Sequence, residues 1–113
     1  TVSWQGNGPS LSTEQQLQFI FILQESLSNI RKHANAQQVN IDFDNQDDFV
    51  MIIRDNGIGL DLYSLAELPP SHVGLSIMRE RASRIRAKLD LDSQLGEYTQ
   101  IKVTLPQHER SLG

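Results

Sequence analysis

The strongest constraint on the fold is a long helical pattern near the N-terminus. Residues 13–34 contain neither glycine nor proline, and their apolar residues recur at steps of three and four. Ser12 or Thr13 can cap the start of this helix through its hydroxyl group. The sequence therefore predicts one long amphipathic helix, whose packed face we expect to contain Ile20, Leu23, Leu27, Ile30 and Ala34.

The rest of the chain is dominated by alternating apolar and polar residues, which predict β-strands. The predicted strands are residues 1–5, 39–43, 49–53, 89–92 and 100–105. Tight turns at residues 45–48 and around Gly96 join the last four into two hairpins. Between the hairpins, residues 60–73 predict a loop and residues 75–88 a second helix, while residues 106–113 are expected to be a frayed tail.

This order of elements favours an α+β fold, a two-layer sandwich of one mixed, mostly antiparallel sheet with helices on one face. A doubly wound nucleotide-binding fold is not expected, because repeated crossover helices and a glycine-rich first turn are missing from the sequence. At 113 residues the chain has the size of one domain, so we expect residues 1–113 to form a single unit.

Composition excludes several classes of function. The chain has 14 acidic and 10 basic residues and a net charge of −4, which argues against a surface that attracts nucleic acid or anionic lipid. It contains no cysteine, which excludes disulfides and thiolate metal sites. The longest apolar run, residues 19–23, is too short to cross a bilayer.

Three polar residues of the first helix, Glu25, Asn29 and Lys32, fall at steps of four and three. At about 100° per residue they lie within a sector of roughly 60°, on the side opposite the expected packed face. One interpretation is an ordinary solvated helix face. The other is a phosphate and metal site, in which the Asn29 amide oxygen binds Mg²⁺, Lys32 meets phosphate oxygens and Glu25 orients water or a hydroxyl group.

A second candidate site is the segment 55–59 (DNGIG), which directly follows an apolar strand. An ordinary Asx turn explains this pattern. A carboxylate at a strand end beside apolar residues also suits recognition of the exocyclic amine of a flat ring such as adenine. Further along, Gly74 and Leu75 open a helix after a loop, where free backbone N–H groups favour phosphate.

Together these segments resemble the histidine-kinase branch of the ATPase superfamily that includes gyrase, the heat-shock chaperone ATPases and the MutL repair proteins. Residues 24–34 (QESLSNIRKHA) resemble the family's asparagine box. Residues 55–59 (DNGIG) resemble its first glycine box, and residues 72–82 (HVGLSIMRERA) its second, in the form used by nitrate/nitrite-sensor-like kinases. Residues 96–99 (GEYT) resemble the last box. The resemblance covers nearly the whole chain and identifies it as the catalytic domain of a bacterial sensor histidine kinase.

The resemblance assigns expected roles to individual residues. It implies ATP and Mg²⁺ as cofactors, with Asn29 as the metal ligand and Glu25, Asn29 and Lys32 as the catalytic residues. Residues 60–73 would form the lid over ATP. The implied nucleotide-binding residues are Asn29, Lys32, His33, Asp55, Gly57, Ile58, Gly59, Gly74, Leu75 and Thr99. Two positions depart from the family pattern, because Ser71 and Tyr98 stand where glycines are usual.

The resemblance also implies partners. No segment of the sequence resembles the helical hairpin that bears the phosphoacceptor histidine, so the acceptor is expected on a separate dimerisation domain of the same kinase. A response regulator would then receive the phosphoryl group. The domain would lie on the cytoplasmic side of a membrane-bound homodimeric sensor. The alternatives are a superfamily ATPase or serine kinase, and a nucleotide-sensing or docking module without catalysis.

Overall fold

The structure is a computed structural model that describes residues 1–31, 38–57, 75–94 and 96–110. Its elements are β1 (Val2–Gln5), α1 (Thr13–Asn29), β2 (Val39–Asn45), β3 (Phe49–Asp55), α3 (Leu75–Arg84), β4 (Lys88–Gln94), β5 (Tyr98–Leu105) and α4 (Gln107–Arg110). The five predicted strands are therefore present, and most extend beyond their predicted ends. Residues 30–31 continue the first helix as a short π-helical turn. The rest of its predicted continuation, residues 32–34, and the predicted loop at residues 60–73 lie outside the described residues.

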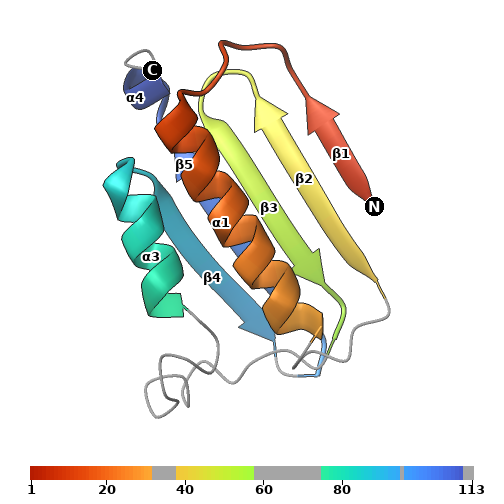
Figure 1. Ribbon diagram of the computed structural model, residues 1–113. Coiled ribbons are helices and arrows are strands. Elements are labelled where there is room, and N and C mark those ends of the chain that lie inside the picture. The colour runs from red at the N-terminus through yellow and green to blue at the C-terminus, as the bar shows by residue number, and fades with distance from the viewer. Residues whose placement is uncertain (32–37, 58–74, 95, 111–113) are drawn as a thin grey trace.

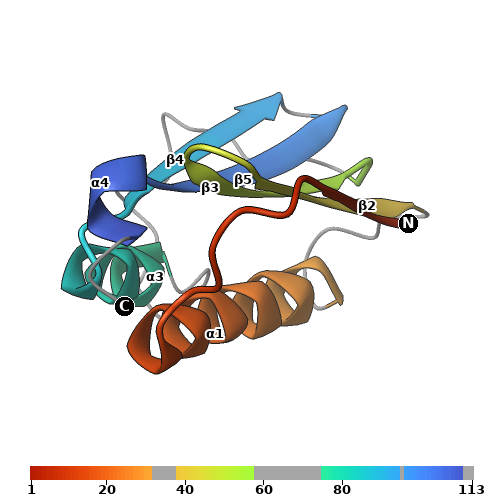
Figure 2. The same cartoon turned by 90° about the horizontal axis from the view of Figure 1, so that it is seen from above.

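The strands form one sheet in the order β1-β2-β3-β5-β4. Strand β1 pairs with β2 in parallel, while β2–β3, β3–β5 and β4–β5 are antiparallel pairs. Helices α1 and α3 lie side by side on one face of this sheet (Figures 1 and 2). These features confirm the predicted two-layer α+β fold and both predicted hairpins.

A capping box starts α1 at the predicted residue. The Ser12 hydroxyl accepts a hydrogen bond of 3.1 Å from the Gln15 N–H, and the Ser12 N–H donates one of 2.9 Å to Gln15 Oε1. Two groups that would otherwise lack a partner at the helix start are therefore satisfied together. Gln15 Nε2 also donates a hydrogen bond of 3.0 Å to the Glu109 carbonyl, which ties the start of α1 to helix α4.

The predicted packed face of α1 is wrong for Ile20 and Leu27, whereas Leu23 and Ile30 do pack against the core. Ala34 lies outside the described residues. Ile20 is 49% exposed and Leu27 is 38% exposed, and Leu23 and Ile30 are only partly buried. The buried residues of the helix are Gln15, Gln18, Phe19, Ile22 and Ser26. Polar side chains can lie on this face because local hydrogen bonds satisfy them, as when the Ser26 hydroxyl donates to the Ile22 carbonyl at 2.7 Å.

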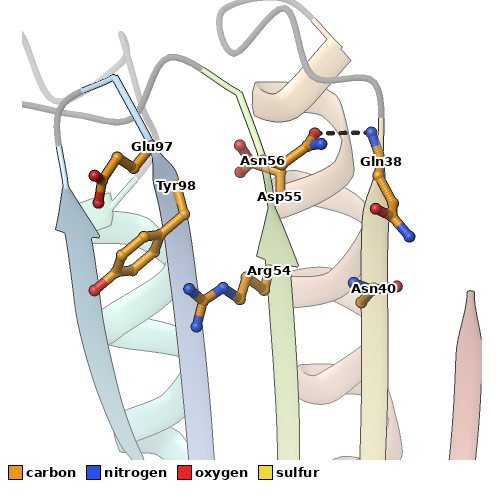
Figure 3. A pocket seen from close by; sticks show the side chains of 7 residues that line it. All are labelled: Gln38, Asn40, Arg54, Asp55, Asn56, Glu97 and Tyr98. Atoms are coloured by element: carbon orange, nitrogen blue, oxygen red, sulfur yellow. Dashed lines mark hydrogen bonds between the residues drawn. The ribbon is translucent and has the colours of Figure 1, made fainter.

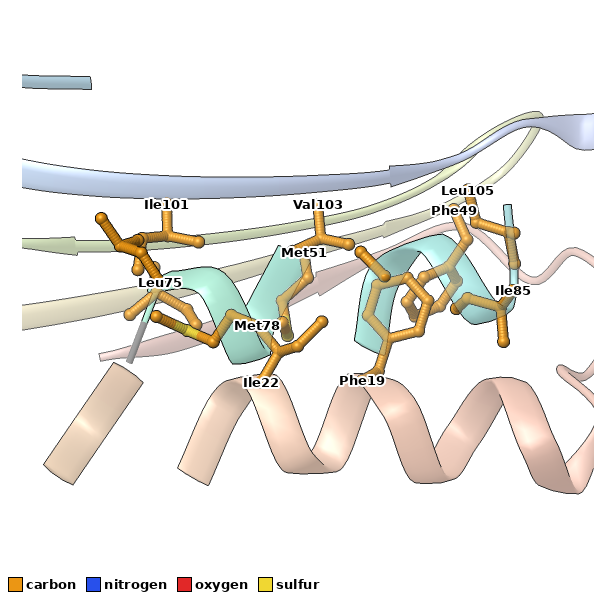
Figure 4. Packing of buried hydrophobic residues seen from close by; sticks show 12 residues of the cluster. Phe19, Ile22, Phe49, Met51, Leu75, Met78, Ile85, Ile101, Val103 and Leu105 are labelled. Carbon is orange, nitrogen blue, oxygen red and sulfur yellow. The ribbon is translucent and has the colours of Figure 1, made fainter. Parts of the chain in front are cut away.

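The core lies between the helices and the central strands. Ile22 of α1, Met51 of β3, Met78 of α3 and Val103 of β5 meet there without measurable solvent exposure (Figure 4). Leu75 and Ile101 continue the cluster toward one end of the sheet, and Phe19, Phe49 and Leu105 continue it toward the other. Ile53 belongs to the same cluster and pairs with Ile101 in the sheet. The core therefore ties two helices to the two central strands.

Helix α3 is shorter than predicted, because it ends at Arg84 and not at residue 88. The helix ends in a Schellman motif. The Ala87 N–H donates a hydrogen bond of 2.9 Å to the Ala82 carbonyl, and the Arg86 N–H donates one of 3.1 Å to the Ser83 carbonyl. Arg86 adopts the left-handed conformation that this motif requires, with φ of 59°. Glycine usually occupies that position, and because arginine stands there instead, no helix stop signal is visible in the sequence.

Replacing Arg86 by glycine should stabilise the fold, because a side chain in the left-handed region costs about 1–2 kcal/mol. The replacement loses the Arg86–Glu109 ion pair of 3.6 Å, in which the arginine side chain is exposed and the glutamate side chain is mostly buried. Ion pairs near the surface contribute about 0–1 kcal/mol. We expect Arg86→Gly to exceed Arg86→Ala by about 1 kcal/mol in the free energy of unfolding, measured by urea titration. Equal stability of the two variants would contradict this account of the helix end.

The predicted frayed tail is wrong for residues 107–110, which form the short helix α4. Its last residue, Arg110, is only 3% exposed. The guanidinium donates to the carbonyls of Gln46 at 3.1 Å and Asp47 at 2.9 Å, and also to Pro9 O and Asn45 Oδ1. One side chain therefore holds the β2–β3 turn against the loop before α1. A single arginine has no periodicity, so sequence patterns miss it.

Loss of the Arg110 guanidinium should destabilise the whole domain, because several buried acceptors would lose their donor. We expect Arg110→Ala to lower the free energy of unfolding by about 2–3 kcal/mol. Arg110→Lys should recover only part of that loss, since one ammonium group cannot reach four acceptors. The exposed Arg79→Ala variant is the matched control, expected within about 0.5 kcal/mol. Equal urea midpoints for Arg110→Ala and Arg79→Ala would refute the role.

Candidate functional site

The described candidate residues gather at one end of the molecule. The C-terminal ends of α1, β3 and β4 and the N-terminal ends of α3 and β5 all lie there (Figure 1). These ends carry Glu25, Asn29, Asp55, Gly57, Leu75 and Thr99. The other candidates, Lys32, His33, Ile58, Gly59 and Gly74, lie outside the described residues.

Glu25 and Asn29 do not lie opposite the packed face of α1, as the sequence had suggested. Asn29 follows the fully buried Ile22 by seven residues, which places the two side chains about 20° apart around the helix. Glu25 lies about 60° from Ile22 by the same geometry. Both side chains are half-buried. The amide and the carboxylate therefore lie on the side of the helix that faces the sheet, near its C-terminal end.

Asp55 ends β3 with its side chain on the helix-facing side of the sheet. Burial alternates along the strand, with Ile53 and Asp55 buried and Arg54 between them exposed. Asp55 is 3% exposed, and its Oδ1 accepts a hydrogen bond of 2.9 Å from the Gly57 N–H. This bond is the Asx turn of the simpler interpretation. The same turn also holds a carboxylate at a fixed place among apolar side chains.

The strand register places two polar side chains in one row beside Asp55. Asp55 pairs with Thr99 of β5, and Thr99 pairs with Ser93 of β4. Residues directly opposite one another on neighbouring strands point to the same face of the sheet. Thr99 is half-buried and Ser93 is 9% exposed. Ser93 was not a candidate from the sequence, because only the strand register places it in this row.

A pocket of about 240 Å³ lies at the same end of the sheet but on the other face (Figure 3). It is lined by Gln38, Asn40, Arg54, Asp55, Asn56, Glu97 and Tyr98. Asp55 is the only predicted binding residue among them. The helices lie behind the sheet in this view, so this pocket and the row that Asp55 forms with Thr99 lie on opposite faces of the sheet, and Asp55 is common to both.

Tyr98, which departs from the family pattern, has its ring on that outer face. The Arg54 guanidinium lies 4.0 Å from the ring centre, and the phenol donates a hydrogen bond of 2.9 Å to Asp92. This hydrogen bond to Asp92 is the main reason that the pKa of Tyr98 is raised above its ordinary value. Because Thr99 points to the opposite face, a bulky residue before it does not enter the helix-facing site.

Among the described residues, no group of three or more histidine, cysteine or acidic side chains is arranged to hold a metal ion. A magnesium ion that is held mainly by phosphate oxygens and water needs few protein ligands. The single amide oxygen of Asn29, half-buried at the end of α1, fits that requirement. Within the same described ranges, no helix is long and apolar enough to span a membrane.

The buried Asp55 carboxylate should make stability depend on pH. Burial raises its pKa above the ordinary value of 3.8, while the Gly57 N–H opposes that shift. The folded state therefore binds this proton more tightly than the unfolded state does. The resulting stabilisation is complete below about pH 3.8 and is lost as the pH rises through the folded-state pKa.

Asp55→Asn removes this titration and can keep the bond from the Gly57 N–H. We expect the variant to gain stability relative to the original protein as the pH rises from about 3 to 7. Urea titrations at several pH values measure the difference. Asp90→Asn, at an exposed carboxylate on β4, is the matched control. A difference for Asp55→Asn that does not change with pH would contradict the raised pKa.

Residues 14–109 match the family described as "Histidine kinase-, DNA gyrase B-, and HSP90-like ATPase". Among curated relatives, the chain is 32% identical over 102 residues to the nitrate/nitrite sensor protein NarQ of Escherichia coli, covering 88% of this chain and 18% of that protein. It is 36% identical over 110 residues to the signal transduction histidine-protein kinase/phosphatase UhpB of Salmonella typhimurium, covering 94% of this chain and 20% of that protein. The chain thus spans about a fifth of these relatives.

Solved structures agree on the fold. The histidine kinase domain of the Erythrobacter litoralis EL346 blue-light activated histidine kinase superposes with a TM-score of 0.72 at 16% identity, covering 98% of this chain and 56% of that one. The Acinetobacter baumannii histidine kinase AdeS superposes with a TM-score of 0.68 at 14% identity, covering 81% and 47%.

Proposed function

Because the chain belongs to the family of histidine kinase-, DNA gyrase B- and HSP90-like ATPases, we propose that it is the ATP-binding catalytic domain of a sensor histidine kinase. In this role it binds Mg-ATP and transfers the γ-phosphoryl group to a histidine on a separate dimerisation domain. The observation that carries the proposal is the gathering of Asn29, Asp55 and Thr99 at one end of the fold.

Base recognition is assigned to the β3–β5 part of the site. Asp55 is buried and ionisable and offers acceptor oxygens, so it suits the exocyclic amine of adenine. Thr99, directly opposite it on β5, is the second polar group on that face. Gly57 and Gly59 would shape the wall of the base pocket, since glycine lets a flat ring approach the backbone closely. Ile58 between them would add apolar surface to that wall.

Phosphate binding is assigned to the helix ends. Leu75 begins α3, whose first backbone N–H groups lack partners within the helix and favour an anion. Gly74, Lys32 and His33 would add further contacts to the phosphates, and residues 60–73 would cover the nucleotide. Asn29 would hold Mg²⁺, which neutralises charge on the transferred phosphoryl group. Glu25 would orient the attacking group beside it.

The proposed partner is the domain of the same kinase that carries the acceptor histidine, and through it a response regulator. Because the curated relatives are named as sensors and histidine-protein kinases, we favour this role over a superfamily ATPase, a serine kinase or a non-catalytic module. We place the chain in the nitrate/nitrite-sensor-like subfamily. The parent protein would be a membrane-bound homodimer with this domain in the cytoplasm, at the bacterial inner membrane.

Removing the Asn29 amide should separate metal-dependent function from folding. Gln24→Ala is the matched control, because Gln24 is an exposed amide on the same helix. We expect Asn29→Ala to remain folded while Mg-ATP binding weakens by about tenfold or more, and while phosphorylation of an added acceptor domain falls by at least as much. Gln24→Ala should keep both functions.

Binding is measured by calorimetry with Mg²⁺ and with a chelator, and phosphotransfer by acid-labile phosphate on the acceptor domain. A folded Asn29→Ala variant with normal phosphotransfer would remove Asn29 from the metal site. If the unaltered domain binds no ATP under any of these conditions, the proposed function itself is wrong.

A further inference from the structure

We propose that Ser93 is a positioning residue that forces the Thr99 hydroxyl to act as a hydrogen-bond acceptor toward the purine base. By doing so it adds to the preference for a 6-aminopurine over a 6-oxopurine nucleotide. The inference rests on the proposed function, because it needs Asp55 and Thr99 to face the base. It concerns a residue of β4 that lies outside the family motifs and is not among the site residues predicted from the sequence.

The two hydroxyl groups and a carbonyl form a short chain at the end of the sheet. Ser93 Oγ lies 2.8 Å from the Tyr98 carbonyl oxygen and 3.1 Å from Thr99 Oγ1. Ser93 and Thr99 are directly paired across β4 and β5. Ser93 is nearly buried, at 9% exposed. Its hydroxyl is therefore held in place by neighbours that belong to the next strand.

The direction of these hydrogen bonds follows from counting protons. A carbonyl oxygen can only accept, so the 2.8 Å contact with Tyr98 requires the Ser93 hydroxyl to donate. A serine hydroxyl has one proton, which that bond uses. In the 3.1 Å contact Ser93 Oγ must then accept, and Thr99 must donate. The Thr99 proton is directed toward β4, so toward any other neighbour the Thr99 hydroxyl can only accept a hydrogen bond.

An acceptor at Thr99 has a definite consequence for the base. Asp55 opposite it is also an acceptor when ionised, so the row presents two acceptors to the ligand. The 6-amino group of adenine has two N–H bonds, enough for both. A 6-oxopurine places a carbonyl oxygen at the same point, which would face two acceptors without a proton between them. A hydroxyl that was free to rotate would instead donate to that oxygen.

A purely structural role for Ser93 makes a different prediction. The bond from Ser93 to the Tyr98 carbonyl also stabilises the end of the β4–β5 hairpin. If that were its only role, replacement would lower stability and would change the affinity for all nucleotides equally. The informative measurement is therefore the ratio of affinities for a 6-aminopurine and a 6-oxopurine nucleotide, which differ at the 6-position and in the proton on N1. This ratio cancels the contributions of ribose and phosphates.

The test is a double-mutant cycle with ATP and inosine triphosphate, read by equilibrium binding. The proteins are the unaltered domain, Ser93→Ala, Thr99→Val and the double variant. We expect Ser93→Ala to reduce the ATP-to-inosine-triphosphate affinity ratio by about fivefold or more, the size of one hydrogen bond. In the Thr99→Val background the same replacement should leave the ratio unchanged. Ser93→Thr, which keeps a hydroxyl, should retain the original ratio.

Ser93→Cys serves as a second variant if Ser93→Ala does not fold, because a thiol of similar size is a weak hydrogen-bonding group, and it should also lower the ratio. The inference is overturned if these variants keep the original ratio, or if the ratio falls equally with and without the Thr99 hydroxyl. Absence of ATP binding by the unaltered domain would overturn the proposed function together with it. ATP binding with an unchanged ratio would overturn the role of Ser93 alone.

Discussion

The geometry of the site depends on the packing of Ile22, Met51, Met78 and Val103, which are all without measurable exposure. Helix side chains advance by about 100° per residue, so burying Ile22 also turns Asn29 toward the sheet. Strand side chains alternate, so burying Met51 places Asp55, four residues on, on the same face. The core therefore sets the direction of the two residues that we assign to the metal and to the base.

Much of this fold could be predicted from the sequence, because strand alternation, tight turns and the Ser12 cap are local patterns. The packed face of α1 could not, since three of its five buried residues are polar and donate hydrogen bonds to other residues. The burial of Arg110 was missed for a related reason. Arg110 gathers acceptors from segments more than sixty residues away, and nothing in the local pattern of residues 106–113 indicates them.

The residues of the candidate site also fall into two groups, those that local sequence patterns predict and those that only the folded structure brings together. Spacing along one helix singled out Glu25 and Asn29, and position after an apolar strand singled out Asp55. Thr99 was predicted only through the family resemblance, and Ser93 was not predicted at all. Their relation to Asp55 is a matter of register between β3, β5 and β4, which a single sequence does not contain. Sequence patterns thus identify residues that share an element, whereas a site that crosses three strands appears only after folding.

Base recognition in this arrangement would use groups that are already fixed before the ligand arrives. Asp55 is buried and oriented by the Gly57 N–H, and Thr99 is oriented by Ser93. The desolvation of the carboxylate is therefore a cost of folding, which the core must offset, and not a cost of binding. A ligand amine that reaches the row meets acceptors with little left to order or dehydrate. The same burial that destabilises the empty domain at neutral pH would thus favour binding of a nucleotide with a donor at the 6-position.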